Sequence, residues 1–177
     1  MPWALDWPQF RAVCFDDDRV ATCIRNRADA IRRYNEHFRV EIEGGDPDLE
    51  TALKMISARQ KGPGYALGYA LDLLVQCHGR LLANAGLSAC RWSWIAAVAA
   101  AVQQVRPELD LESDFCRQPP GIDLPTGMDF PLIGFIPRHD LHLLASVPHS
   151  NDDELELAFA NLRSWAEPGL DVVTFYY

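Results

Sequence analysis

The sequence lacks the long apolar run that a membrane-spanning helix requires. Its longest apolar stretch covers residues 94–102 and is largely alanine, whereas a spanning helix needs about 20 consecutive apolar residues. The opening residues, MPWALDWPQF, also lack the basic region, the apolar region and the cleavage site of a secretory signal. We therefore expect neither membrane insertion nor export, and we predict that the protein acts in the cytoplasm.

The cysteines lack the spacing of a structural framework. The sequence contains five cysteines, which is an odd number, and no two of them have the spacing of a CxxC motif. Such a set argues against a disulfide framework and against a zinc knuckle, so we predict neither a bound metal nor a cofactor. We interpret each cysteine as a small buried apolar residue in a reducing compartment. They are Cys14, Cys23, Cys77, Cys90 and Cys116.

Motifs that carry catalysis are also missing. No serine stands in a GxSxG pattern, and the glycine-rich residues 62–68 follow a predicted helix and lack the lysine of a phosphate-binding loop. Cys77 and His78 are sequence neighbours, so on a helix their side chains point in different directions and do not form a dyad. The sequence therefore favours a protein that is not an enzyme.

Length and composition indicate a globular protein. The chain has 177 residues, of which 49% are hydrophobic and 23% charged, and this balance predicts one globular domain over residues 1–177. The expected fold class is α+β, predominantly helical, with a small sheet. We expect that sheet to contain residues 2–5, residues 130–136 and the C-terminal strand.

Apolar residues recur at helical spacing in the first part of the chain. The acidic run Asp16–Asp18 predicts the start of the first helix, and Asp46 followed by Pro47 predicts the start of the second. Gly86 and Pro107 are expected to end the third and the fourth helix. The four predicted helices cover residues 16–40, 46–60, 65–85 and about 88–107.

The second part of the chain is expected to mix loop, strand and helix. Prolines between residues 107 and 131 predict a long acidic loop. A short apolar strand is predicted at residues 132–136, followed by a brief helix from Pro137 to Leu144. Ser150 and Asp153 match a capping box that opens the last helix. Residues 170–177 are rich in β-branched and aromatic side chains, which predicts a strand covered on both faces.

The net charge of −9 is unevenly distributed along the sequence. Residues 19–39 contain six arginines against two acids, and Arg25, Arg32 and Arg39 are spaced to share one helix face. We interpret this row as solvated or paired with nearby acids. Binding of nucleic acid is disfavoured, because phosphate contacts require a net basic face and the row lacks interleaved aromatic residues.

Acidic residues gather between residues 107 and 130, where six acids stand against Arg117 alone. A fixed acidic surface can steer a basic partner and complement it.

Trp92 and Trp94 are two residues apart and cannot share a helix face, so one of them is expected to meet solvent, a loop or a partner. The predicted partner-binding residues are Glu108, Asp110, Glu112, Asp114, Asp123, Asp129, Trp92 and Trp94.

Three histidines suggest an alternative function. His139 and His142 are spaced i, i+3 on a predicted helix, and His149 follows seven residues later. Together with Asp140 they favour a small metal-dependent enzyme as the alternative function. The spacing is not that of an HExxH motif, and Pro148 separates the third histidine from the others, so we prefer solvent-facing or capping histidines.

Three segments resemble those of a protein family. The three segments are residues 64–72 (GYALGYALD), residues 129–134 (DFPLIG) before a short helix, and a closing helix that leads to VVTFYY. Together they resemble segments of small bacterial proteins of the YfbM-like type. This resemblance implies an α+β fold without a catalytic motif, and some proteins of the type look like immunity proteins. We therefore predict a non-enzymatic immunity protein that binds and neutralises a cognate toxin; a structural subunit of a bacterial assembly is a further alternative.

Overall fold

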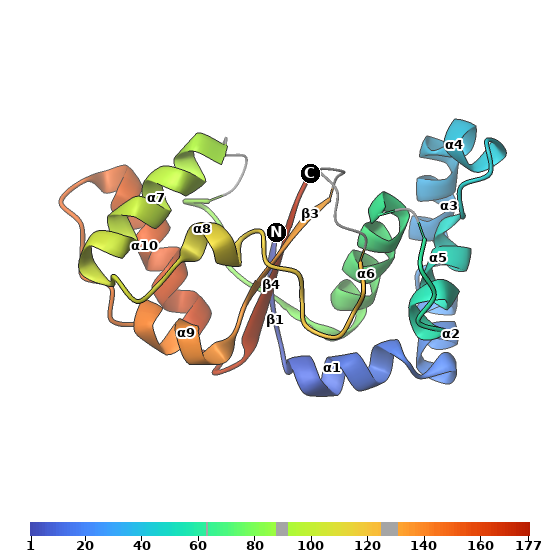
Figure 1. The fold of residues 1–177 in the computed structure, drawn as a ribbon, viewed down its shortest axis with the longest axis horizontal. Coiled ribbons are helices and arrows are strands. Elements are labelled where there is room, and N and C mark those ends of the chain that lie inside the picture. The colour runs from blue at the N-terminus through green and yellow to red at the C-terminus, as the bar shows by residue number, and fades with distance from the viewer. Residues whose placement is uncertain (63, 88–91, 125–130) are drawn as a thin grey trace. The chain divides into compact units, whose positions relative to one another are not determined.

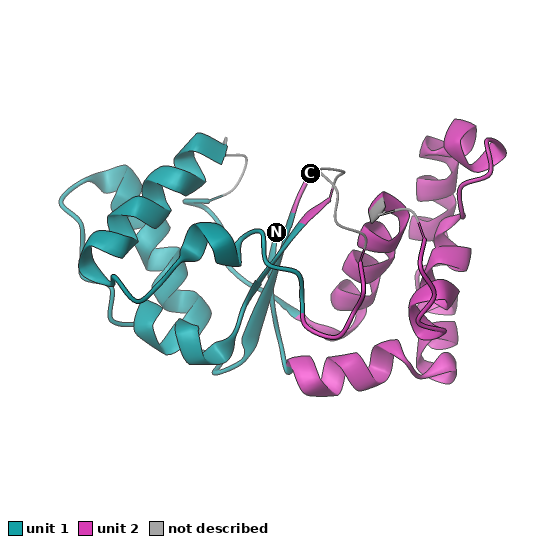
Figure 2. Ribbon diagram, in the orientation of Figure 1, with its two compact units in different colours: residues 1–6, 80–119, 133–175 teal, residues 7–79, 120–132, 176–177 magenta. Residues whose placement is uncertain are grey.

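The structure is a computed structural model that describes residues 1–62, 64–87, 92–124 and 131–177. Its internal contacts divide the chain into two compact units (Figure 2). Unit 1 consists of Met1–Asp6, Arg80–Pro119 and Ile133–Phe175, and unit 2 consists of Trp7–Gly79, Pro120–Leu132 and Tyr176–Tyr177. Segments that are distant in the sequence therefore contribute to each unit.

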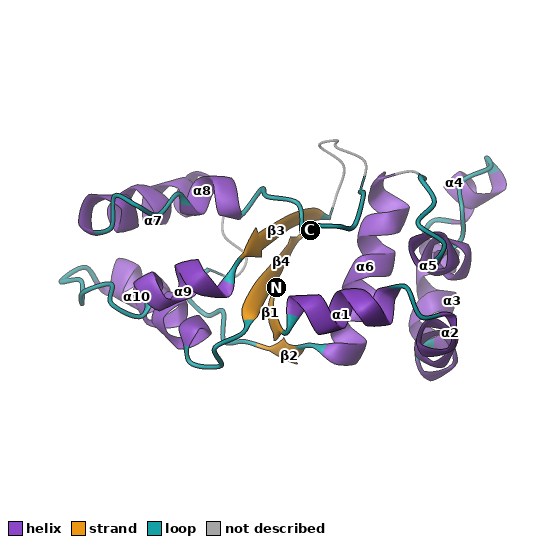
Figure 3. Cartoon of the chain, turned by 60° about the horizontal axis from the view of Figure 1, so that its bottom comes forward, coloured by secondary structure: helices purple, strands orange, loops and turns teal. Residues whose placement is uncertain are grey.

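Most of a four-stranded sheet belongs to unit 1 (Figure 3). Its strands are β1 (Pro2–Leu5), β2 (Arg80–Leu81), β3 (Leu132–Ile136) and β4 (Asp171–Tyr176), in the order β2-β1-β4-β3. Strand β1 runs antiparallel to both of its neighbours, with Trp3 opposite Val173 and Leu81. The first five residues of β4 are buried, which confirms the prediction of a C-terminal strand covered on both faces.

The helices of unit 1 lie on one side of this sheet (Figure 1). They are α7 (Trp92–Val105), α8 (Leu111–Asp114), α9 (Arg138–Leu144) and α10 (Asp153–Ala166). Phe115 and Trp165 fill the core of unit 1 with rings in edge contact, and the indole nitrogen of Trp165 donates to the carbonyl of Ala83 at 2.7 Å. Asp171 at the start of β4 accepts the backbone N–H of Arg138 at 2.9 Å. This bond caps the first turn of α9, because the first amides of a helix have no partner within it.

Unit 2 is helical. It contains α1 (Trp7–Cys14), α2 (Asp17–Asn26), α3 (Ala28–His37), α4 (Arg39–Glu43), α5 (Leu49–Ser57) and α6 (Gly64–His78). Helix α5 packs against α2, α3 and α6. The fully buried side chains of this core are aliphatic and come mainly from α5 and α6: Leu53, Leu67, Leu71 and Leu74.

Two predicted helices are wrong in extent. The predicted helix over residues 16–40 is three consecutive helices, α2 to α4, separated at Arg27 and Phe38. The predicted helix over residues 65–85 ends at His78, and Arg80 and Leu81 instead pair with β1. Gly79 directly follows the true end of α6, so the sequence did contain the terminating glycine that helices prefer.

Two predicted caps are also wrong, each by two residues. Asp48 rather than Asp46 caps α5, and Asp152 rather than Ser150 caps α10. The predicted loop over residues 107–131 contains one helical turn, α8, which the sequence reading did not include. The predicted strand at residues 132–136 is confirmed, and Pro137 directly precedes the brief helix that ends at Leu144.

The fold class is α+β, predominantly helical, with a small sheet that includes the C-terminal strand, as the sequence predicts. Within the described ranges, every helix is too short or too polar to cross a membrane.

Candidate functional site

The acidic segment, residues 108–114, follows the C-terminal end of α7 in unit 1. Exposed acids alternate with buried leucines over residues 108–112. Glu108, Asp110 and Glu112 are exposed, whereas Leu109 and Leu111 are only 2% and 1% exposed. The two leucines therefore anchor the segment in the core and hold three carboxylates on the surface.

Local hydrogen bonds fix Asp110 within this segment. Its carboxylate accepts the backbone N–H of Ser113 at 3.2 Å and the Ser113 hydroxyl at 2.6 Å, so Asp110 is the N-cap of α8. The hydroxyl bond, followed by the backbone bond, lowers the pKa of Asp110, because both bonds favour the charged carboxylate. The side chain is thus ionised and held in one orientation.

Asp114 differs from the three exposed acids. It is 2% exposed, and Nη2 of Arg117 lies 2.8 Å from its Oδ1. Burial raises the pKa of Asp114 to about 6, the Arg117 charge opposes this rise, and the neighbouring carboxylates of Asp140 and Asp110 add to it. Because it is buried and paired, we do not include Asp114 in the candidate surface.

The remaining predicted acids, Asp123 and Asp129, come later in the sequence than the acidic segment. Asp123 belongs to unit 2, where it is exposed and its carboxylate lies 3.5 Å from Nζ of Lys61. Asp129 lies outside the described residues. The candidate surface of unit 1 therefore rests on Glu108, Asp110 and Glu112.

The two tryptophans take different environments, as their spacing predicts. Trp92 opens α7 and is 40% exposed. Trp94 is half-buried, and its indole nitrogen donates to the carbonyl of Gly86 at 3.0 Å. Helix α8 packs back against α7 (Figure 1), so the exposed Trp92 ring and the acidic segment belong to one pair of packed helices.

The histidines are not brought together. His139 and His142 are exposed on α9, and Nε2 of His139 lies 3.4 Å from the Asp140 carboxylate. His149 Nδ1 lies 2.8 Å from Oε1 of Glu156 on α10. The described ranges contain no group of three or more histidine, cysteine, aspartate or glutamate side chains arranged to hold a metal ion, so the alternative enzyme reading gains no support from the geometry.

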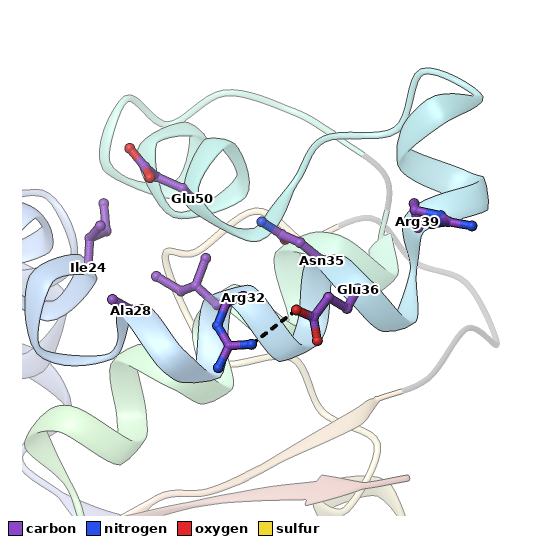
Figure 4. A pocket seen from close by; sticks show the side chains of 8 residues that line it. Ile24, Ala28, Arg32, Asn35, Glu36, Arg39 and Glu50 are labelled. Atoms are coloured by element: carbon purple, nitrogen blue, oxygen red, sulfur yellow. Dashed lines mark hydrogen bonds and ion pairs between the residues drawn. The ribbon is translucent and has the colours of Figure 1, made fainter.

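Two of the three arginines in the row of unit 2 pair with nearby acids, and Arg25 instead donates to the Thr22 hydroxyl at 2.9 Å. Arg32 lies 3.5 Å from Asp29 and 3.1 Å from Glu36, and Arg39 lies 3.6 Å from Glu43. Arg32, Glu36 and Arg39 line a depression of about 420 Å³ (Figure 4). Its lining combines apolar side chains with charges of both signs: Ile24, Ala28, Ile31, Arg32, Asn35, Glu36, Arg39 and Glu50.

Residues 1–177 match the family described as a domain of unknown function, DUF7691. The chain belongs to the DUF7691 family. No curated protein and no solved structure matches it. Membership in DUF7691 does not test the resemblance to YfbM-like proteins, which stays a prediction.

The acidic surplus of this DUF7691 protein is concentrated in unit 1. The sequence segments of unit 1 contain twelve acidic and six basic residues, whereas those of unit 2 contain thirteen acidic and ten basic residues. The acidic segment therefore lies in the unit with the stronger negative charge, and the field of that unit adds to the attraction of a cation.

A pair of thiols in unit 2 of this DUF7691 protein was not predicted from the sequence. Cys14 and Cys23 are buried, as predicted, but Cys77 is half-buried and Cys116 is exposed, so the prediction is wrong for those two; Cys90 lies outside the described residues. The Cys23 sulfur on α2 lies 3.9 Å from the carbonyl oxygen of Leu73, one helical turn before Cys77 on α6. Spacing along the sequence does not reveal such a pair, because its members come from different helices.

Proposed function

We propose that this protein is a non-enzymatic immunity protein that binds and neutralises a basic protein toxin in the bacterial cytoplasm through the acidic segment of unit 1. The observation that carries the proposal is the alternation within that segment. Leu109 and Leu111 are buried while Glu108, Asp110 and Glu112 are exposed, so three negative charges stand on a backbone that the core holds in place.

A surface built in this way suits the recognition of a basic partner. Ordering flexible side chains and loops on binding costs free energy, and a segment that is already fixed avoids much of this cost. The Asp110 cap and the anchoring leucines supply that order before the partner arrives. Opposite charges also accelerate the encounter, by an amount that falls as salt is added.

The exposed ring of Trp92 gives the same helix pair an aromatic contact. Aromatic residues are enriched among those that carry most of the binding energy of an interface. In this proposal Trp92 supplies apolar contact area, while the acidic segment supplies attraction and orientation. The choice of a toxin among basic proteins rests on the resemblance of residues 64–72, 129–134 and the closing segment to YfbM-like proteins, some of which look like immunity proteins.

Growth protection tests this function. Each product of the genes that flank the gene of this protein would be expressed in a bacterial host, with and without the protein. We expect one flanking product to stop growth and the protein to restore it. Toxicity that the protein does not relieve, or no toxic product on either side, would contradict the proposal.

Matched variants tie the protection to the acidic segment. The triple variant Glu108→Gln, Asp110→Asn, Glu112→Gln removes three charges, and asparagine at position 110 still caps α8 because it is as good an N-cap as aspartate. The control variant Asp153→Asn, Glu154→Gln, Glu167→Gln removes three exposed charges from the α10 region of the same unit. We expect the first variant to lose protection and the control to retain it.

A further inference from the structure

Three thiols lie on helices of unit 2 that pack together. Cys14 ends α1, Cys23 lies on α2, and Cys77 lies in the last turn of α6. Cys14 and Cys23 are 0% and 2% exposed, whereas Cys77 is half-buried. Of the three thiols, Cys77 is therefore the one that a small reagent reaches from solvent.

Cys23 and Cys77 are direct neighbours. The Cys23 sulfur lies 3.9 Å from the carbonyl oxygen of Leu73, which is one helical turn before Cys77 on the same face of α6. Within α6 the Leu73 carbonyl is also the acceptor for the backbone N–H of Cys77, so the Cys23 sulfur lies beside the backbone of Cys77. The contact between α2 and α6 thus places two thiols from distant parts of the sequence against each other.

An arginine completes this cluster. Arg27 separates α2 from α3, and its Nη2 donates to the carbonyl of Gln76 at 3.0 Å. This bond holds the guanidinium beside Cys77, which directly follows Gln76 on α6. The arginine therefore has a fixed position next to the half-buried sulfur.

The environments of the two sulfurs favour opposite protonation states. The neighbouring Cys23 thiol and the Arg27 guanidinium together lower the pKa of Cys77 to about 6, although burial opposes this shift. The neighbouring Cys77 and burial raise the pKa of Cys23. These environments favour the thiolate form of Cys77 and the protonated form of Cys23. The thiolate is the form of cysteine that reacts with electrophiles.

We propose that Cys77 and Cys23 form a redox-active pair in which Cys77 reacts with a hydroperoxide and Cys23 then closes a disulfide. This site lies in unit 2 and does not depend on the partner-binding function proposed for unit 1. It assigns chemistry to two side chains that otherwise serve only as small core residues.

The two steps balance. The Cys77 thiolate attacks one peroxide oxygen and breaks the O–O bond, the other oxygen leaves as hydroxide and takes up a proton, and Cys77 becomes a sulfenic acid. Cys23 then loses its proton and attacks the Cys77 sulfur, the S–O bond breaks, and water leaves. In sum, two thiols and one hydrogen peroxide give one disulfide and two waters. The two sulfurs approach to about 2 Å in the second step.

Peptide mapping after oxidation tests the pair. The reduced full-length protein would be treated with hydrogen peroxide at pH 7, its remaining thiols alkylated, and its peptides identified by mass spectrometry. We expect a Cys23–Cys77 disulfide, together with unmodified Cys116. Burial of its sulfur and the neighbouring Glu112 raise the pKa of Cys116, so this exposed cysteine is an internal control for non-specific oxidation.

Variants separate the roles within the pair. Cys77→Ser removes the reaction, whereas Cys23→Ser leaves a sulfenic acid on Cys77 that dimedone traps. Arg27→Gln slows the oxidation of Cys77 roughly three- to tenfold at pH 7, because a smaller share of Cys77 is thiolate. Arg27→Lys restores much of the rate, and Arg25→Gln, which alters an exposed arginine bonded to Thr22 on the same helix, leaves it unchanged.

Two results would overturn the proposal. One is oxidation of Cys116 at the same rate as Cys77, and the other is absence of the Cys23–Cys77 disulfide in the folded wild-type protein. Circular dichroism of each variant checks that it is folded before its rate is compared. If Arg27→Gln unfolds the chain, the pH dependence of Cys77 alkylation in the wild type decides, with an expected midpoint near 6.

Discussion

Arg117 holds its guanidinium 2.8 Å from the carboxylate of Asp114, which is almost completely buried in unit 1. The pair is one helical turn from the exposed Asp110 along the chain, since Asp114 ends α8 and Asp110 caps it. Even with this partner, burial raises the pKa of Asp114 to about 6. A buried charge is costly unless its interactions fully replace those that it made with water. The raised pKa of Asp114 indicates that the ion pair with Arg117 does not fully replace them.

Asp114 makes the stability of the protein depend on pH. Because its folded-state pKa of about 6 is above the ordinary value of 3.8, the protonated form is favoured by folding. The stabilisation is present in full below pH 3.8 and is lost as the pH rises through 6. From this group alone, we expect the free energy of unfolding to fall by roughly 2 to 3 kcal/mol across that window.

Urea unfolding of the wild type and of Asp114→Asn at pH 4 and pH 7 measures this effect. Asparagine cannot ionise, so the advantage of the variant over the wild type should grow between the two pH values. A constant difference would show that Asp114 has an ordinary pKa in the folded protein.

Glu156 has the opposite pH dependence. The backbone N–H of Ser150 donates to its carboxylate, His149 and Arg163 also contact it, and together they lower its pKa from 4.5 to about 2. A lowered pKa stabilises the folded state above pH 4.5, and this contribution disappears as the pH falls through 2. We therefore expect Glu156→Gln to lower the melting temperature at pH 7 and to lose this effect near pH 2. A melting difference that is equal at both pH values would contradict the assignment.

Gly134 is required by the packing of β3. An added Cβ atom would lie 2.4 Å from Oγ1 of Thr174 and 2.7 Å from the backbone oxygen of Phe115, and the backbone cannot easily give way. We expect Gly134→Ala to cost about 2 to 4 kcal/mol of folding free energy. Gly169→Ala is the comparison: its φ of +63° is unfavourable for alanine, but no atom lies within 4 Å of the added carbon, so we expect a cost of about 1 kcal/mol. Urea unfolding of both variants measures the difference, and equal costs would contradict this packing role.

The sequence predicts those elements whose signals are local. Pro137 sets the boundary between β3 and α9, and the β-branched and aromatic run at the C-terminus predicts β4. The break between α2 and α3 has no local signal, because neither glycine nor proline stands at Arg27. That residue instead bonds to Gln76 on another helix, and such tertiary contacts override helix propensity.

The candidate surface was only partly predictable for the same reason. The cluster of acids in the sequence identifies Glu108, Asp110 and Glu112, and the structure exposes all three. The burial of Asp114 depends on the packing of α8, and the assignment of Asp123 to unit 2 depends on the division of the chain into units. Neither follows from the charge pattern alone.

The affinity of the purified protein for the toxic product of a flanking gene tests the central claim most directly. Calorimetric titration would compare the wild type with the variant Glu108→Gln, Asp110→Asn, Glu112→Gln and with the α10 control variant, at low and at physiological salt. We predict at least about tenfold weaker binding for the first variant, equivalent to about 1.4 kcal/mol, with a smaller salt dependence than the wild type. Equal affinity of all three proteins would contradict the role of the acidic segment.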